Sequence, residues 1–373
     1  MSQPLFSETI RSHVRRQRAI PASTPFPCTS SLSRGRSPRP PHSVHRLRPG
    51  DIDVIAAIGD SLVAANGALE EYALGAFIEY RGVSWCAGGD STWREYLTLP
   101  NILKEYNPDI KGFSTGTGEW ITKNAKLNVA FPVASDQDAL KQAKVCNLLY
   151  IIFIVTRHLI SMVNIDIARD WKMVTVFMGA NDLCSASCLS PIAWSPAAHG
   201  RKMAKALDYL YEHLPRTIVN LIPVLGKNRL ALATIIFKFT IHEGLAGKEC
   251  HELQQLVNSG RYNSRNDFTV VIQPFMKLFN APQPLTDPLP IVIHQSYITH
   301  DCFHFSQKGH ALAANLLWNN LLEPVGAKSE KIPPILFKNF LCPTAEAPYI
   351  FTANNSRNFL QTGRQDGGYL DEW

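Results

Sequence analysis

Two short apolar runs that end in glycine constrain the fold most strongly. VIAAIG spans residues 54–59 and VTVFMG spans residues 174–179. Neither shows the alternation of polar and apolar residues that marks a half-exposed strand, and continuous apolar strands are typical of parallel sheets covered on both faces. FTVVIQPF at 268–275 has the same character. These runs predict an α/β fold with a mostly parallel central sheet.

Segments with helical spacing lie between and after these runs, and they predict helices at 98–106, 137–145, 201–214 and 309–325. Strands that alternate with helices predict a doubly wound sheet, in which functional residues gather where the strands end. The run VCNLLYIIFIVTRHLISMV at 145–163 fits this pattern less well. Its uninterrupted apolar part is about a dozen residues, whereas a membrane span needs about 20. We therefore expect a buried core segment there.

The positive charge is concentrated near the N-terminus. The formal net charge is +6, yet residues 1–50 contain nine Arg, no Lys and one acidic residue. The rest of the chain is therefore weakly acidic, and its composition gives no support for nucleic-acid binding. Pro, Ser and Arg dominate residues 1–48, which predicts a disordered or loosely draped tail. This tail also lacks the apolar region of a secretory signal.

Eight cysteines permit disulfides without defining their pairing. The CSASC segment at 184–188 has no second Cys or His pair at zinc-ligand spacing, so a disulfide or free thiols are the better interpretation. One glycosylation sequon is present, at Asn354.

Ser61 is a candidate nucleophile because Gly-Asp-Ser follows the first apolar run directly. The triplet alone is ordinary turn chemistry. A nucleophilic serine also needs a base, an acid that orients the base, and donors for the oxyanion. Asn181 and Asp182 follow the second apolar run in the same way, and the Asn181 amide could serve as an oxyanion donor.

The segment DCFHFSQKGH at 301–310 supplies a candidate base. Asp301 and His304 are three residues apart, so the carboxylate can reach the imidazole and hold its tautomer. His310 is the competing histidine, but no acidic residue stands three positions before it. His304 is therefore preferred.

The ordered set GDSL at 59–62, GAND at 179–182 and DCFH at 301–304 resembles blocks I, III and V of the SGNH/GDSL hydrolase superfamily. Longer stretches, among them YRGVSWCAGGD and DCFHFSQKGHALAANLLWNNLLEPVG, resemble the membrane-associated phospholipase B1 family. The resemblance implies a three-layer α/β/α SGNH-hydrolase (flavodoxin-like) domain over 49–326, followed by an irregular C-terminal extension over 327–373. It also implies cleavage of acyl esters of phospholipids and other lipids at a lipid–water interface, without a metal or other cofactor.

Carried over by motif, the resemblance makes Ser61 the nucleophile and His304 the general base and acid. Asn181 and the backbone amide of Ser61 would stabilise the oxyanion. The orienting acid stays open: most of the superfamily uses the position of Asp301, whereas the phospholipase B branch has been assigned the position of Asp182. The spacing to His304 favours Asp301.

Three features depart from the family pattern. Block II, here NVAFPVA at 128–134, has Val133 where the family has a glycine whose amide completes the oxyanion hole. The apolar run at 145–163 stands where a polar helix is expected. A signal peptide, further modules and a membrane anchor are also missing, which suggests a one-module fragment or variant. An extracellular or apical plasma-membrane location is implied by the resemblance alone, and no protein partner is indicated.

Two other functions compete with a phospholipase. Val133 and the apolar run favour a catalytically silent module that binds lipid or supports neighbouring modules. A GDSL esterase for non-lipid esters would use the same residues as the phospholipase.

Overall fold

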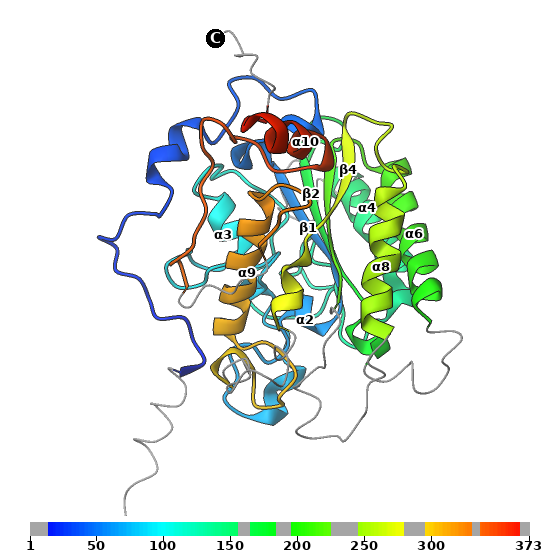
Figure 1. Ribbon diagram of the computed structural model, residues 1–373. Coiled ribbons are helices and arrows are strands. Elements are labelled where there is room, and N and C mark those ends of the chain that lie inside the picture. The colour runs from blue at the N-terminus through cyan, green and yellow to red at the C-terminus, as the bar shows by residue number, and fades with distance from the viewer. Residues whose placement is uncertain are drawn as a thin grey trace, which may run out of the picture.

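The computed structural model describes residues 14–155, 165–183, 195–224, 245–279, 295–329 and 336–365. Within these residues, four parallel strands form a sheet in the order β1-β2-β3-β4 (Figure 1). The strands are β1 (Val54–Gly59), β2 (Lys172–Phe177), β3 (Thr217–Ile222) and β4 (Phe268–Ile272). Every strand residue is buried, and the predicted α/β fold with a parallel sheet is confirmed.

Helices cover both faces of this sheet. The α-helices of the described residues are α2 (Ser61–Ala64), α3 (Leu99–Leu103), α4 (Ala139–Val155), α6 (Pro196–His213), α8 (Leu245–Asn258), α9 (Gln307–Leu321) and α10 (Ala353–Thr362). All four predicted helical segments contain helix, although the first is shortened to α3. β3 and α8 were not predicted, although TIVNLI at 217–222 is an apolar run of the same kind.

Alternate residues of each strand enter two separate cores. Ala57 and Ile218 pack with α3 and α9, whereas Ala56 and Val219 pack with α4, α6 and α8. Figure 1 shows α3 and α9 on one side of the sheet and α4, α6 and α8 on the other. This is the three-layer arrangement that strands buried on both faces require.

The sheet has a switch point at β1, because Lys111 and Asn128 form isolated parallel bridges along its outer edge. The Ile55 amide donates to Lys111 O at 2.9 Å, and the Val129 amide donates to Ala57 O at 3.0 Å. β1 therefore has parallel partners on both sides, the bridge residues Lys111 and Asn128 on one and β2 on the other. In doubly wound sheets, ligands bind beside the carboxyl end of such a strand.

The first part of the apolar run at 145–163 forms the second half of α4, and residues 156–163 lie outside the described part. α4 packs against β1 and α6. Its Gln142 side chain accepts from the Gly59 amide and donates to the Gly59 carbonyl, both at 2.8 Å. This helix therefore helps to hold the end of β1. Among the described residues, no helix combines the length and apolar character needed to cross a membrane.

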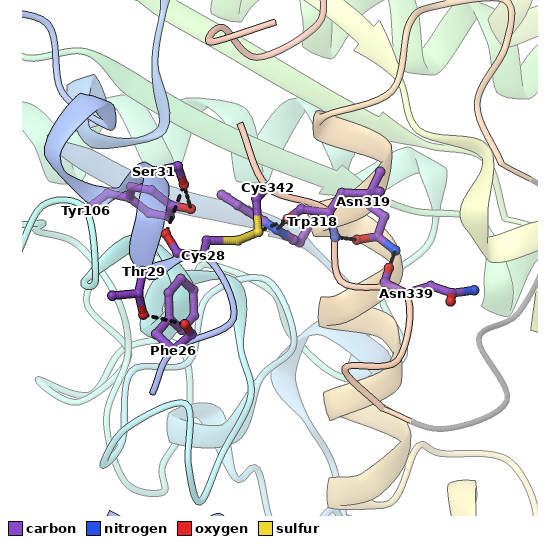
Figure 2. Close-up of a disulfide and its surroundings, with 10 residues drawn as sticks. Phe26, Cys28, Thr29, Ser31, Tyr106, Trp318, Asn319, Asn339 and Cys342 are labelled. Atoms are coloured by element: carbon purple, nitrogen blue, oxygen red, sulfur yellow. Dashed lines mark hydrogen bonds between the residues drawn. A yellow bond between two sulfur atoms is a disulfide. The ribbon is translucent and has the colours of Figure 1, made fainter. Parts of the chain in front are cut away.

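The N-terminal segment 14–48 packs on the domain instead of forming the expected loose tail. Phe26, Val44 and Leu47 are buried, and Cys28 forms a disulfide with Cys342, 314 residues later (Figure 2). The apolar residues scattered among the Arg and Pro of this segment therefore pack against the domain. Cys184 and Cys188 lie outside the described residues.

The C-terminal extension is more regular than expected, because it contains α10. The Ile350 amide donates to Leu47 O at 2.7 Å, and the Asn355 side chain donates to His45 O at 2.9 Å. The extension thus pairs with the N-terminal segment. The domain boundaries at residues 49 and 326 stay predictions.

Candidate functional site

Ser61 lies just past the carboxyl end of β1, where the chain turns into α2. Gly59 has no room for a side chain, because a Cβ there would lie 2.4 Å from Val63 Cγ2. Asp60 caps the turn by accepting a hydrogen bond from the Leu62 amide at 2.9 Å. Ser61 is the first residue of α2 and 5% of its surface is exposed. The turn therefore holds a serine at the switch point of the sheet.

Asp301 and His304 form a hydrogen-bonded pair in the loop before α9. Asp301 Oδ2 lies 2.5 Å from His304 Nδ1. Asp301 Oδ1 accepts from the Thr299 hydroxyl at 2.5 Å and from the amides of Phe303 and His304 at 2.9 and 3.0 Å. The loop thus surrounds the carboxylate with donors.

These contacts set the charge of the pair. Burial raises the pKa of Asp301, but the hydrogen bond and charge of His304 and the Thr299 bond outweigh it and hold the pKa well below its usual range. An ionised Asp301 can only accept, so His304 Nδ1 carries a proton. In a neutral imidazole, Nε2 is then the basic atom.

The loop that carries His304 is tied to the segment that follows the Gly-Asp-Ser turn, because the Gln307 amide donates to Ala68 O at 2.8 Å. Burial raises the pKa of Asp60 to about 7, and the hydrogen bond from the Leu62 amide and the interaction with His304 oppose that rise. His304 Nε2 is buried and has no hydrogen-bond partner within the described part of the chain. No hydrogen bond therefore joins it to Ser61 there, and the pairing of nucleophile and base stays a prediction. Such bonds often tighten only when substrate binds.

His310, the competing histidine, is a core residue of α9. Its Nδ1 accepts a hydrogen bond from the Trp85 amide at 3.3 Å, and burial lowers its pKa to about 3. The ring is therefore neutral at physiological pH and serves the packing of α9.

Blocks II and III meet beside the Gly-Asp-Ser turn, where the Phe131 amide of block II donates to Gly59 O at 3.3 Å. The Asn181 side-chain amide donates to Ala134 O at 2.8 Å, which orients Asn181. The neighbouring Val133 has φ +64° and a side chain that is 78% exposed. This left-handed conformation is the one a glycine adopts without strain, whereas a β-branched residue rarely takes it. Val133 thus holds the backbone conformation expected of the missing glycine.

Asp182 contacts Asp136 and not the His304 loop. Its carboxylate accepts from the Asp136 amide at 3.0 Å. Asp136 in turn contacts Lys202 Nζ at 2.7 Å and His199 Nδ1 at 3.3 Å, both on α6. Of the two candidate acids, Asp301 is therefore the one in contact with His304.

The buried acids differ in charge. Burial, followed by the charge of Asp136, raises the pKa of Asp182 to about 8. Burial also raises the pKa of Asp136, but His199 and Lys202, which contact its carboxylate, outweigh burial and lower that pKa overall. At neutral pH, Asp182 therefore holds a proton and Asp136 is ionised. Donor atoms of Asp136, Asp182 and His199 lie within 4.8 Å of one another, a spacing that could hold a metal ion. Since the Lys202 ammonium contacts Asp136, the cluster can balance its charge without one.

Arg81 holds the start of block II. Its guanidinium is fully buried, pairs with Glu79, and donates to the carbonyls of Asn128 at 2.9 Å and Ala130 at 2.6 Å. Sequence reasoning gave no role to Arg81, nor to the cluster residues Asp136, His199 and Lys202. Arg81 lies in the family-like stretch YRGVSWCAGGD, whereas no motif marks the other three.

Comparison with known proteins identifies the family of this chain. The family model for GDSL-like lipases and acylhydrolases matches residues 55–317. "Phospholipase B1, membrane-associated" of Homo sapiens is 39% identical over 347 residues, and its namesake of Rattus norvegicus is 36% identical over 353 residues. Each alignment covers 85% of this chain but only 22% and 23% of the relative, so the chain spans less than a quarter of these proteins. The family model matches more than half of the chain and leads to one assignment: the chain belongs to the GDSL-like lipase/acylhydrolase family.

Proposed function

We propose that this chain is a serine esterase of the lipase type that hydrolyses acyl esters of phospholipids, and of glycerides as a second class. Ser61 is the nucleophile, His304 the general base and acid, and Asp301 the residue that orients His304. The contact between Asp301 and His304 beside the Gly-Asp-Ser turn carries this proposal, and family membership supports it.

The reaction proceeds by acyl transfer. Ser61 Oγ attacks the ester carbonyl carbon while His304 Nε2 takes the hydroxyl proton. The tetrahedral intermediate collapses, its C–O bond to the alcohol breaks, and His304 returns the proton to the leaving oxygen. Water then attacks the acyl-enzyme with the same assistance, which releases the fatty acid and restores Ser61. Asp301 stays ionised and stabilises the imidazolium.

The oxyanion formed in each step needs hydrogen-bond donors. The proposal assigns the backbone amides of Ser61 and Val133 and the side-chain amide of Asn181. The bond from Asn181 to Ala134 O supports this assignment because it brings blocks II and III together. Removing one such donor lowers kcat by about 10²–10³-fold.

A lipid surface as the site of action is supported by an apolar rim, which consists of Tyr72, Leu74, Phe77 and Ile78. Leu74 and Phe77 are 85% and 83% exposed. This segment includes the short helix η4 (Ala73–Phe77), at the end of the molecule where β1 leads into α2 (Figure 1). The Gly67 amide donates to Ile78 O at 2.8 Å, which ties the rim to the segment after α2. The rim would enter the lipid surface beside the site.

The proposed location is extracellular or on the apical plasma membrane. The Cys28–Cys342 disulfide supports this, because disulfides persist in oxidising compartments.

Labelling with a fluorophosphonate tests the nucleophile. The wild type is expected to react, Ser61→Ala to lose at least 100-fold in rate, and Ser259→Ala, which alters an exposed serine after α8, to react normally. Circular dichroism first establishes that all three proteins fold. Equal labelling of the wild type and Ser61→Ala would overturn the proposal.

Turnover of dispersed phosphatidylcholine, compared with a soluble short-chain ester, tests the substrate class. The double variant Leu74→Ser and Phe77→Ser is expected to lose at least about tenfold in phospholipid hydrolysis, since each buried side chain contributes about 1.5–3 kcal/mol. Its turnover of the soluble ester should be unchanged. Leu360→Ser on α10, at the opposite end of the molecule (Figure 1), is the control. Serine-dependent turnover of the soluble ester alone would favour a non-lipid esterase, and no turnover of either would favour a silent module.

A further inference from the structure

Two hydrogen bonds join the loops of blocks II and III. Asn181 donates through its side chain to Ala134 O, and the Asp136 amide donates to the Asp182 carboxylate. The two loops are therefore connected on either side of Ser135. A shift of either loop would change the distance between Asn181 and Val133.

Helix α6 contacts both of these loops and anchors them. Lys202 and His199, in its first two turns, contact the two carboxylate oxygens of Asp136. His199 also packs on block III itself, because a Cβ at Gly179 would lie 3.1 Å from His199 Cε1. Asp136, Asp182 and His199 are each 1% exposed.

We propose that Asp136, Asp182, His199 and Lys202 form a positioning network for the oxyanion hole, in which Asp182 acts through Asn181 and Val133 and not on His304. This proposal rests on the proposed function. The network sets the spacing of the two loops, and α6 anchors it to the body of the domain.

The positioning network also makes the geometry of the oxyanion hole sensitive to alkaline pH. Within the described part of the chain, the charged and titratable groups that face Asp182 are Asp136 from η6 (Asp136–Asp138) and His199 and Lys202 from α6. As pH rises through about 8, Asp182 loses its proton beside the ionised Asp136. Two buried carboxylates then repel each other across the junction, and the loops separate.

Asp182→Asn separates this role from that of a triad acid. The asparagine keeps an oxygen that accepts from the Asp136 amide, and its NH₂ can donate to the Asp136 carboxylate. We expect kcat at pH 7 on a soluble ester to stay within about threefold of the wild type. Asp301→Asn, in contrast, should lose kcat by about 10⁴-fold, as for a triad acid.

The pH profile adds a readout that a merely structural role would not change. Wild-type kcat should fall with an apparent pKa near 8, and Asp182→Asn should lack this alkaline limb. Lys202→Gln should move the limb to higher pH, because the ammonium favours the ionised form of Asp182. Asp182→Ala, which removes the acceptor, should lower kcat by about 10²-fold with little change in KM. Thermal unfolding at each pH establishes that the variants are folded.

The outcomes distinguish this proposal from the proposed function. Asp182→Asn as inactive as Asp301→Asn would overturn the positioning role and make Asp182 the orienting acid. An unchanged alkaline limb in Asp182→Asn, or full kcat in Asp182→Ala, would also overturn it. A wild type without Ser61-dependent turnover would instead reject the proposed function, and the positioning role with it.

Discussion

Replacing Val133 by glycine should make the protein both more stable and more active. At φ +64° a β-branched residue bears a strain of about 1–3 kcal/mol. Glycine removes this strain, although its greater freedom in the unfolded chain costs about 0.4–1 kcal/mol. Little apolar burial is lost, because the Val133 side chain is 78% exposed. We expect Val133→Gly to raise the free energy of unfolding by about 0.5–2 kcal/mol.

The effect on activity follows from the same strain. If the left-handed conformation that aims the Val133 amide lies about 1–2 kcal/mol above other local conformations, it is populated about 5–30-fold less than with glycine. The corresponding increase should appear in kcat, since the oxyanion forms only in the transition state, and KM should change little.

Urea unfolding with a constant m value and initial rates on a soluble ester measure the two effects. Val133→Ala is the matched control, because it keeps a Cβ at the same φ and should recover only part of each gain. A Val133→Gly protein with no gain in stability would refute the strain argument. A more stable protein with unchanged or lower kcat would refute the assignment of this amide to the oxyanion hole.

Three further predictions concern other parts of the molecule. Gly179→Ala should lower the free energy of unfolding by about 1–3 kcal/mol in urea titrations and reduce kcat, because Gly179 has φ +125° and directly precedes the Asn181 loop. Replacing both Cys28 and Cys342 by serine should cost about 2–5 kcal/mol in thermal unfolding and leave soluble-ester turnover intact; an unchanged melting temperature would contradict this. The pKa of Asp182 rises from 3.8 to about 8 on folding, so the folded protein keeps a proton that the unfolded chain releases. The wild type should therefore lose stability relative to Asp182→Asn as pH rises between these values, and a constant difference would be inconsistent with the buried acid.

The fold was largely predictable because its signals are local. A strand that is apolar on both faces must be buried between two layers of helices. This pattern predicted β1, β2 and β4 directly. β3 carries the same signal in TIVNLI. The packing of the segment 14–48 was not predictable, since its Arg and Pro content indicates disorder and only the distant partner Cys342 and the buried surface around Phe26 reverse that expectation.

The candidate site also has one part that the sequence could predict and one part that it could not. Asp301 and His304 stand three residues apart, so one turn of chain brings them into contact and the pairing can be inferred from spacing alone. Asp182 is also close in sequence to Asn181, yet spacing could not say which basic or acidic group it meets. Its contact with Asp136, 46 residues earlier, depends on how two loops and α6 pack together.

The sequence by itself determined the parallel sheet, the serine turn at the end of β1 and the Asp-His pair, because each depends on residues within a few positions of one another. Only the tertiary structure decided the partner of Asp182, the left-handed backbone of Val133 and the closure of both terminal segments by the Cys28–Cys342 bond. Those features arise from contacts between segments far apart in the chain. Such contacts form only where packing brings the segments together, and no local pattern encodes them.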